Sequence, residues 1–124
     1  MASPSRMLII LTTGPEDRGS RATLAFSMGT AALISGVEVS IYLTMGGTFW
    51  SREGSERAVH IPGFDPLATY IQQFTEASGK LLVCSPCDAF YCAIAKEERL
   101  RAGAERCGLA HIVDLALGST TVTM

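Results

Sequence analysis

The feature that most constrains the fold is a continuous apolar run near the start of the chain, MLIILT at Met7–Thr12. A strand with one face in solvent alternates apolar and polar residues, whereas a strand buried on both faces is apolar throughout. Apolar residues at helical spacing follow between Arg18 and Ser35, and Gly36 predicts the helix C-terminal cap. The β-branched segment Val37–Leu43 predicts a second strand. This order of elements predicts a βαβ unit.

Strands and helices continue to alternate along the rest of the chain. A helix is expected from about Leu67 to Ser78, with Asp65 as its N-cap and Pro66 as its first residue. This alternation predicts an α/β fold, a five-stranded parallel sheet with helices on both faces. The remaining elements are expected to be a strand at Lys80–Cys84, a helix through about Ala95, a strand at Gly103–Cys107 or alternatively at Ala110–Leu115, a helix at Leu109–Leu117 and a strand at Ser119–Met124.

Composition and charge fit a single domain over residues 1–124, with residues 1–5 expected to be disordered. Apolar residues make up 48% of the chain, enough for one core, and the low charged fraction of 18% suggests that another subunit covers part of the surface. A net charge of −2 without a Lys/Arg cluster argues against a nucleic-acid partner. The first apolar run is too short for a signal peptide or a membrane span, so we expect a cytoplasmic protein with reduced cysteines.

Cys84 ends the third predicted strand, and Cys87 lies in the first turn of the following helix. Reactive groups of open parallel sheets gather at the carboxyl ends of the strands. Helix N–H groups there favour a thiolate, whereas the neighbouring Asp88 carboxylate raises a thiol pKa. We therefore expect an active but moderately tuned thiol at Cys84, with Cys87 either resolving a disulfide or simply packing. Cys92 and Cys107 are expected to be core residues.

Other interpretations of the cysteines stay open. Cys84 could fill space in the core, because free cysteine is among the most buried residues. The Cys84-x-x-Cys87 spacing also occurs in thioredoxin-like dithiol sites, but the sequence before Cys84 does not match that family. A zinc or iron–sulfur site would require a second close-spaced ligand pair, which the sequence lacks, so we expect no metal and no cofactor. His60 and His111 form no catalytic pair with a cysteine that spacing alone can identify.

The loop after the first strand is a candidate ligand-binding segment. If the strand order is 2-1-3-4-5, Thr12, Thr13 and Gly14 lie beside the strand that carries Cys84 and line the same crevice as Ser85. An ordinary loop and helix start is the alternative. Neither GxGxxG nor GxxxxGK[ST] occurs, which argues against nucleotide or flavin binding.

The stretch Thr44–Pro66 shows no clear periodicity and is long for a connection in a compact domain. Gly46 and Gly47 follow the second strand and permit close backbone approach, so we expect them to contribute to the same crevice. Phe49 and Trp50 are expected to wall that pocket or dock a partner. The alternative is that these aromatic residues form a local mini-core.

The segment KLLVCSPCDAFYC resembles the DsrE/DsrF-like family, in which a cysteine ends the third strand. The tail LRAGAERCGLAHIVDLALGSTTVTM and the opening MLIILTTGPEDRGSRATLAFSMGTAALISGVEVSIYLTMGG are also similar to that family. The resemblance implies a flavodoxin-like sheet that assembles as homotrimers or hexamers, and it favours the strand at Gly103–Cys107. It also implies that Cys84 matches the cysteine that carries a persulfide in some members, which exchange sulfur with TusA-like carriers. Cys87 and Cys92 resemble the family's multi-cysteine subgroup.

The leading hypothesis is therefore an intracellular sulfur-transfer or persulfide-carrying protein, in which Cys84 accepts sulfane sulfur and Cys87 assists. If it turns over, its enzyme class is sulfurtransferase. The alternative is a non-catalytic oligomeric module that binds a small ligand or a protein at the crevice. A third hypothesis is dithiol redox exchange between Cys84 and Cys87.

Overall fold

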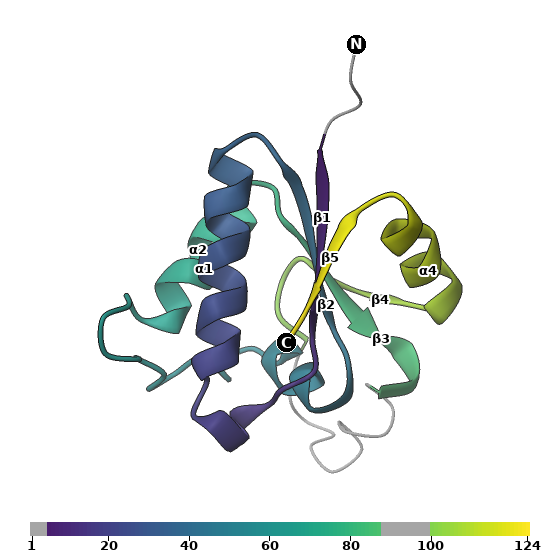
Figure 1. The fold of residues 1–124 in the computed structure, drawn as a ribbon. Coiled ribbons are helices and arrows are strands. Elements are labelled where there is room, and N and C mark those ends of the chain that lie inside the picture. The colour runs from purple at the N-terminus through teal and green to yellow at the C-terminus, as the bar shows by residue number, and fades with distance from the viewer. Residues whose placement is uncertain (1–4, 88–99) are drawn as a thin grey trace.

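A computed structural model describes residues 5–87 and 100–124 (Figure 1). Five parallel strands form one sheet in the order β4-β3-β2-β1-β5, which confirms the predicted five-stranded parallel sheet. The strands are β1 (Arg6–Leu11), β2 (Glu38–Leu43), β3 (Lys80–Cys84), β4 (Ala104–Cys107) and β5 (Thr120–Thr123). The described helices are η1 (Pro15–Asp17), α1 (Ser20–Ile34), η2 (Met45–Ser51), α2 (Leu67–Glu76) and α4 (Leu109–Leu117).

The helices cover both faces of the sheet, as predicted. Figure 1 shows α1 and α2 on one face and α4 on the other. Successive strand residues alternate between two cores. The core beneath α1 and α2 includes Phe26 and Phe74, whose rings meet edge to face with centroids 5.6 Å apart. The smaller core on the α4 face contains Tyr42, Cys84 and Ile112. Cys84 therefore points to the α4 face.

The strand order corrects the order 2-1-3-4-5, because β2 lies between β1 and β3. The helices α1 and α2 pack against each other on one face. Since parallel crossovers are right-handed, two helices on the same face move the chain from β1 to β2 to β3 in one direction. The crossover through α4, on the opposite face, carries the chain back to the free edge of β1. The loop after β1 is therefore not adjacent to β3.

The ends of the first two helices fit the sequence in part. Gly36, with φ +89°, follows the end of α1, as expected of a C-terminal glycine. The helix α2 ends two residues before the predicted Ser78. Its N-cap position is taken by Pro66 rather than Asp65, and no side chain caps it. The Asp65 N–H instead donates to the Tyr70 hydroxyl at 3.1 Å, so the predicted Asp65 cap is wrong.

The elements around the cysteines agree with the prediction. A strand at Ala104–Cys107 confirms the preferred assignment, and the alternative strand at Ala110–Leu115 is wrong because those residues lie in α4. Helical backbone begins at Ser85, directly after Cys84. The expected continuation of this helix to about Ala95 lies outside the described residues.

The segment Thr44–Pro66 is ordered around a buried tryptophan. Trp50 is 1% exposed and packs in the core, and its Nε1 donates to the Thr13 carbonyl oxygen at 2.8 Å. Phe49 is partly buried and meets Trp50 edge to face, with ring centroids 4.9 Å apart. The expectation that Trp50 walls a pocket or docks a partner is wrong. Its large apolar surface is used to hold η2 against the sheet.

Arg101 also holds the segment Thr44–Pro66 in place through several hydrogen bonds. Its guanidinium donates to the Trp50 oxygen at 2.8 Å, to the Arg52 oxygen at 3.0 Å and to the Glu56 carboxylate at 3.2 Å. The backbone N–H of Arg101 also donates to the Ser51 oxygen at 2.7 Å. Arg101 is 8% exposed, so this is a buried network whose charge is paired. The segment after η2 is therefore fixed by a residue about fifty positions away in sequence.

Two further expectations concern disorder of residues 1–5 and the absence of a membrane span. Residues 1–4 lie outside the described residues, and the Ser5 carbonyl oxygen accepts a hydrogen bond from the Glu38 N–H at 3.0 Å. No helix among residues 5–87 and 100–124 is long and apolar enough to cross a membrane.

Candidate functional site

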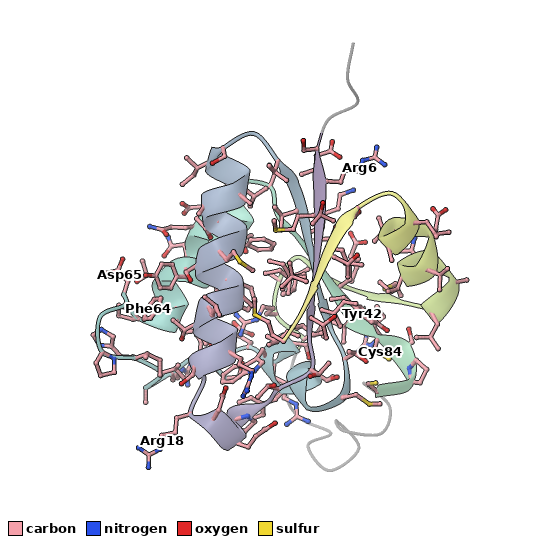
Figure 2. The ribbon with its side chains drawn as sticks, viewed as in Figure 1. Arg6, Arg18, Tyr42, Phe64, Asp65 and Cys84 are labelled. Carbon is pink, nitrogen blue, oxygen red and sulfur yellow. The ribbon has the colours of Figure 1, made fainter. Side chains whose placement is uncertain are left out.

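The register of the sheet brings two cysteines and a threonine together at the carboxyl ends of the strands. Cys84 pairs with Cys107 across β3 and β4. Leu43 pairs with Val83 across β2 and β3, so Thr44, which follows β2, comes next to Cys84. Figure 2 shows Tyr42 and Cys84 near each other, at the end of the sheet opposite Arg6. The strand beside Cys84 is therefore β2 rather than β1.

Cys84 is a buried thiol that is 2% exposed. Its sulfur accepts a hydrogen bond from the Cys87 backbone N–H at 3.4 Å, as expected of a group at a helix start. Burial raises the pKa of Cys84, but hydrogen bonds with the Cys87 thiol, the Tyr42 hydroxyl, the Cys87 N–H and the Thr44 hydroxyl lower it. The net result is a pKa below the ordinary thiol value, so the thiolate of Cys84 is favoured.

The pKa values of Tyr42 and Cys107, which lie beside Cys84, are raised, whereas that of Cys84 is lowered. Burial and the neighbouring Cys84 raise the pKa of the Tyr42 phenol, so Tyr42 remains protonated and can donate. The Tyr42 oxygen is buried, and among the described residues it has no hydrogen-bond partner of standard geometry. Burial, Cys84 and Glu105 raise the pKa of the Cys107 thiol. The shifts therefore favour the thiolate at Cys84 over the thiolate at Cys107.

Cys87 is partly exposed, and its sulfur is held by the end of β2. The Met45 backbone N–H donates to the Cys87 sulfur at 3.2 Å, and the Thr44 hydroxyl lies 3.3 Å from the same atom. Met45 has a φ of +52°, which is uncommon for a residue with a Cβ. Strained backbone of this kind costs about 1–3 kcal/mol and concentrates at functional sites. We name Thr44 and Met45, with these two donors, the sulfur cradle.

The two predicted ligand-binding loops pack on each other and support the sulfur cradle. The Gly47 N–H donates to the Thr12 oxygen at 3.0 Å and to the Thr44 oxygen at 2.9 Å. A Cβ on Gly47 would collide with the Leu11 carbonyl, and one on Gly14 would come within 2.6 Å of the Gly46 carbonyl oxygen. Glycine at these positions is therefore required by close packing between the loops.

The hydroxyl groups of Thr12 and Ser85 donate to backbone oxygens of other segments. Thr12 donates through Oγ1 to the Met124 oxygen at 2.9 Å, which ties the end of β1 to the C-terminal residue. Ser85 donates through Oγ to the Cys107 oxygen at 3.1 Å and so joins the helix start to β4. Thr13 contributes its carbonyl oxygen to Trp50. That these residues bind a ligand stays a prediction.

Of the remaining sequence candidates, Cys107, His60 and His111 lie among the described residues. Asp88 and Cys92 lie outside the described residues. Cys107 is partly buried and packs against the core of the α4 face. His60 lies in an exposed turn with Nε2 2.9 Å from the Phe64 oxygen, and His111 is exposed on α4. Within residues 5–87 and 100–124, no three Cys, His, Asp or Glu side chains are grouped to hold a metal ion.

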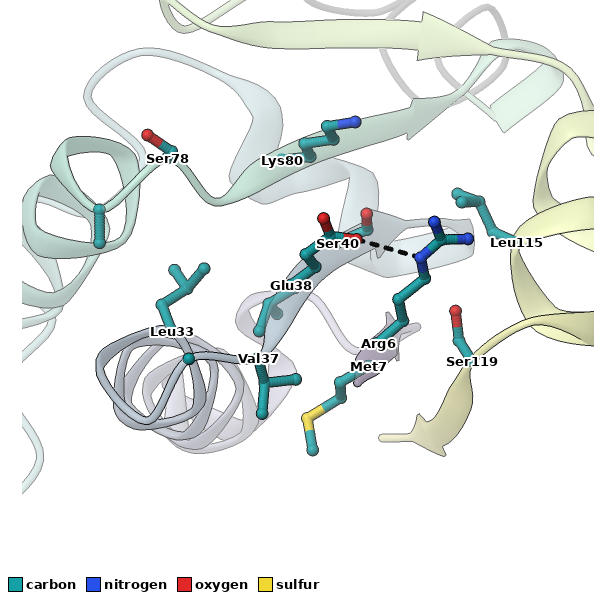
Figure 3. Close-up of a pocket in the computed structure, with 13 residues that line it drawn as sticks. Arg6, Met7, Leu33, Val37, Glu38, Ser40, Ser78, Lys80, Leu115 and Ser119 are labelled. Atoms are coloured by element: carbon teal, nitrogen blue, oxygen red, sulfur yellow. Dashed lines mark hydrogen bonds and ion pairs between the residues drawn. The ribbon is translucent and has the colours of Figure 1, made fainter. Parts of the chain in front are cut away.

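A pocket of about 580 Å³ lies at the opposite, amino-end edge of the sheet (Figure 3). Its lining includes Arg6, Glu38 and Lys80 from the starts of β1, β2 and β3. Arg6 and Glu38 form an exposed ion pair at 3.0 Å there. None of the site residues predicted from the sequence lines this pocket. The cysteines and this pocket are separate features.

Tyr42, Thr44 and Met45 are the site residues that sequence reasoning missed. A usable signal was present, because Tyr42 alternates with the buried Ile41 and Leu43 and so faces the same side of the sheet as Cys84. That signal becomes decisive only when β2 is known to pair with β3. No sequence signal indicates that the Met45 N–H turns toward Cys87.

Comparisons with known proteins agree with this architecture. The structure of the YchN protein from E. coli superposes with a TM-score of 0.75 at 14% sequence identity, covering 97% of this chain and 99% of that chain. MTH1491 from Methanobacterium thermoautotrophicum, a protein of unknown function, gives a TM-score of 0.69 at 16% identity over 97% and 99% of the two chains. A search of curated protein sequences found no match. The family profile of the DsrE/DsrF-like proteins matches residues 5–122, and the chain belongs to that family.

Proposed function

We propose that this protein transfers sulfur and carries sulfane sulfur as a persulfide on Cys84. The DsrE/DsrF-like family is associated with sulfur relay in general, which supports this direction. The observation that carries the proposal is the pair of cysteines at the carboxyl end of β3. N–H groups donate to both sulfurs, at 3.4 Å for Cys84 and 3.2 Å for Cys87. Such donors stabilise an anionic sulfur, the form that attacks and leaves in exchange reactions.

The chemistry requires no oxidant, reductant or metal. A thiolate attacks the outer sulfur of a donor persulfide, the donor's S–S bond breaks, and the donor leaves as a thiolate with that electron pair. The sulfane sulfur keeps its oxidation state when it reaches Cys84. An acceptor thiolate then removes it by the same step, and Cys84 returns to a thiolate. We propose a TusA-like carrier as the exchange partner.

Peptide-resolved mass spectrometry tests the proposal. The reduced protein is treated with glutathione persulfide, alkylated and digested with trypsin, which places Cys84, Cys87 and Cys92 in peptide 81–96 and Cys107 in peptide 107–124. Fragmentation of peptide 81–96 then locates the added sulfur on one of its cysteines. We expect the mass of one added sulfur atom at Cys84. The variant Cys84→Ser should lose the sulfur that survives a wash with reduced glutathione, whereas Cys107→Ser should retain it, because the raised pKa of Cys107 disfavours its thiolate.

Two results would contradict sulfur carrying. Absence of site-selective sulfur in the wild-type protein would favour a non-catalytic binding module. A Cys84–Cys87 disulfide formed in place of a persulfide would favour dithiol redox exchange.

A further inference from the structure

The two sulfurs at the end of β3 differ in their access to a partner. Cys84 is 2% exposed and packs among Tyr42, Leu82 and Ile112. Cys87 is partly exposed, one helical turn further along the chain. The persulfide of a folded donor protein must come within bonding distance of the attacking sulfur, so it meets Cys87 before Cys84. Burial thus separates an outer thiol from an inner one.

The outer thiol is also the one that β2 holds in place. The Met45 N–H and the Thr44 hydroxyl contact the Cys87 sulfur at 3.2 and 3.3 Å. Met45 adopts a left-handed backbone conformation with φ +52°, and the N–H of this strained residue is the one that points at the sulfur. Close packing of Gly47 on Leu11 fixes the turn that follows. A sulfur atom that only filled space would not require this arrangement.

We propose that Cys87 is the thiol that exchanges sulfur with an external protein persulfide, and that Cys84 receives its sulfur from Cys87. This relay rests on the proposed sulfur-transfer function. In the first step, the Cys87 thiolate attacks the outer sulfur of the donor, whose S–S bond breaks and whose thiolate leaves. In the second step, the Cys84 thiolate attacks the outer sulfur of the Cys87 persulfide, and Cys87 leaves as a thiolate. Each step forms one S–S bond and breaks one, and the sulfane sulfur is neither oxidised nor reduced.

The structure gives each partner a role in the relay. The sulfur cradle stabilises the Cys87 thiolate both as attacking group and as leaving group, because the Met45 N–H donates to this sulfur and the adjacent Thr44 hydroxyl donates once Cys87 has lost its proton. Cys84, hydrogen-bonded to the Cys87 N–H and beside the Tyr42 hydroxyl, keeps the transferred sulfur away from solvent thiols. Cys87 is the exchange thiol and Cys84 is the protected store.

The test compares a protein donor with a small one. Thiosulfate-charged rhodanese, a folded protein with a single persulfide, and inorganic polysulfide are each mixed with the full chain, and sulfur at each cysteine is followed by rapid quenching and mass spectrometry. In Cys87→Ser, loading of Cys84 from rhodanese should slow by roughly tenfold or more, because the buried thiol then reacts only after local opening. Loading from polysulfide should persist, which shows that Cys84 of the variant still accepts sulfur, and an unchanged circular dichroism spectrum shows that the variant is folded. In Cys84→Ser, sulfur should reach Cys87 from rhodanese at nearly the wild-type rate.

A second variant tests the sulfur cradle without removing a thiol. Thr44→Val keeps the shape of the side chain and removes the hydroxyl, so transfer from rhodanese to Cys87 should slow about fivefold, the rate equivalent of one ordinary hydrogen bond. If Cys87→Ser loads Cys84 from rhodanese at the wild-type rate, the relay is wrong while sulfur carrying stands. If the wild-type protein gains sulfur at neither cysteine from either donor, the proposed function fails as well.

Discussion

Cys84 and Cys107 occupy paired positions at the ends of neighbouring strands, yet their surroundings shift their pKa values in opposite directions. Burial opposes the thiolate at both residues. At Cys84, hydrogen bonds from Cys87, Tyr42 and Thr44 outweigh burial, whereas at Cys107 the nearby Cys84 and Glu105 add to it. Hydrogen bonding, rather than position in the sheet, distinguishes the two thiols.

This difference predicts two separate thiolate titrations, which ultraviolet absorbance follows against pH. Cys84→Ser should remove a component below the ordinary thiol pKa of about 8.5, and Cys107→Ser should remove one above it. A lowered folded-state pKa adds stability above the unfolded-state value. The free energy of unfolding, relative to Cys84→Ser, should therefore rise with pH between the lowered pKa and about 8.5. Tyr42→Phe should move the low component upward. Superimposable titrations of the two cysteine variants would contradict this account.

At the residue scale, the sequence predicted that Cys84 ends a strand but not which residues surround it. Cys84 could be identified because its position depends only on the end of a local apolar run. Its partners Tyr42 and Thr44 come from β2, and their proximity depends on strand pairing between segments about forty residues apart. The left-handed conformation of Met45 is set by packing of neighbouring loops, which no local pattern encodes.

At the scale of elements, Arg101 joins the start of β4 to the segment after η2, and its removal should destabilise the fold. Arg101→Met leaves the Glu56 carboxylate, whose side chain is 16% exposed, without its partner. Breaking a buried pair of this kind costs about 3–5 kcal/mol, and partial exposure of Glu56 places our expectation near 3 kcal/mol. Chemical denaturation measures this loss. Arg6→Met is the matched control, because the exposed Arg6–Glu38 pair should contribute about 0–1 kcal/mol.

The same ion pair should be visible in the acid limb of the stability curve. Burial raises the pKa of Glu56, but hydrogen bonds from Arg101 and the backbone lower this pKa by more than burial raises it. The net pKa is therefore below the ordinary value. Its contribution is therefore present above about pH 4.3 and is lost as the pH falls through the lowered pKa. Glu56→Gln should flatten this part of the curve. A wild-type acid limb in the variant would show that the Arg101–Glu56 pair does not contribute.

At the scale of the whole molecule, the sequence predicted the parallel sheet because β1, β2, β3 and β5 are short apolar or β-branched runs that alternate with helices. The strand order was not predictable from such runs. The strand order depends on which face of the sheet each helix covers. The amphipathic pattern of a helix shows that one side of it is buried, but not on which face of the sheet it packs. The four-residue strands β4 and β5 form the two edges of the sheet. A strand at β5 was predicted from the residues themselves, whereas the family resemblance decided between Gly103–Cys107 and Ala110–Leu115 for β4.

The helix α4 carries a stripe that predicts how whole molecules assemble. Leu109, Val113 and Leu117 recur at intervals of four residues and are 60%, 58% and 85% exposed. Together with the buried Ile112, they make α4 apolar on both its inner and outer faces, as in a helix that is covered. The resemblance noted in the sequence implies homotrimers or hexamers, and we therefore expect a second copy of this chain to cover the stripe.

Light scattering coupled to size exclusion measures this assembly directly. The wild-type protein should elute with the mass of a trimer or hexamer, and the double variant Leu109→Ser, Leu117→Ser should shift toward the monomer, since the lost apolar contacts drive association. Ile34, 79% exposed on α1 at the opposite face, provides the control: Ile34→Ser should leave the mass unchanged. A monomeric wild-type protein at micromolar concentration would remove the second copy from consideration. An unchanged oligomer in the double variant would place the interface on another surface and leave α4 to a different partner.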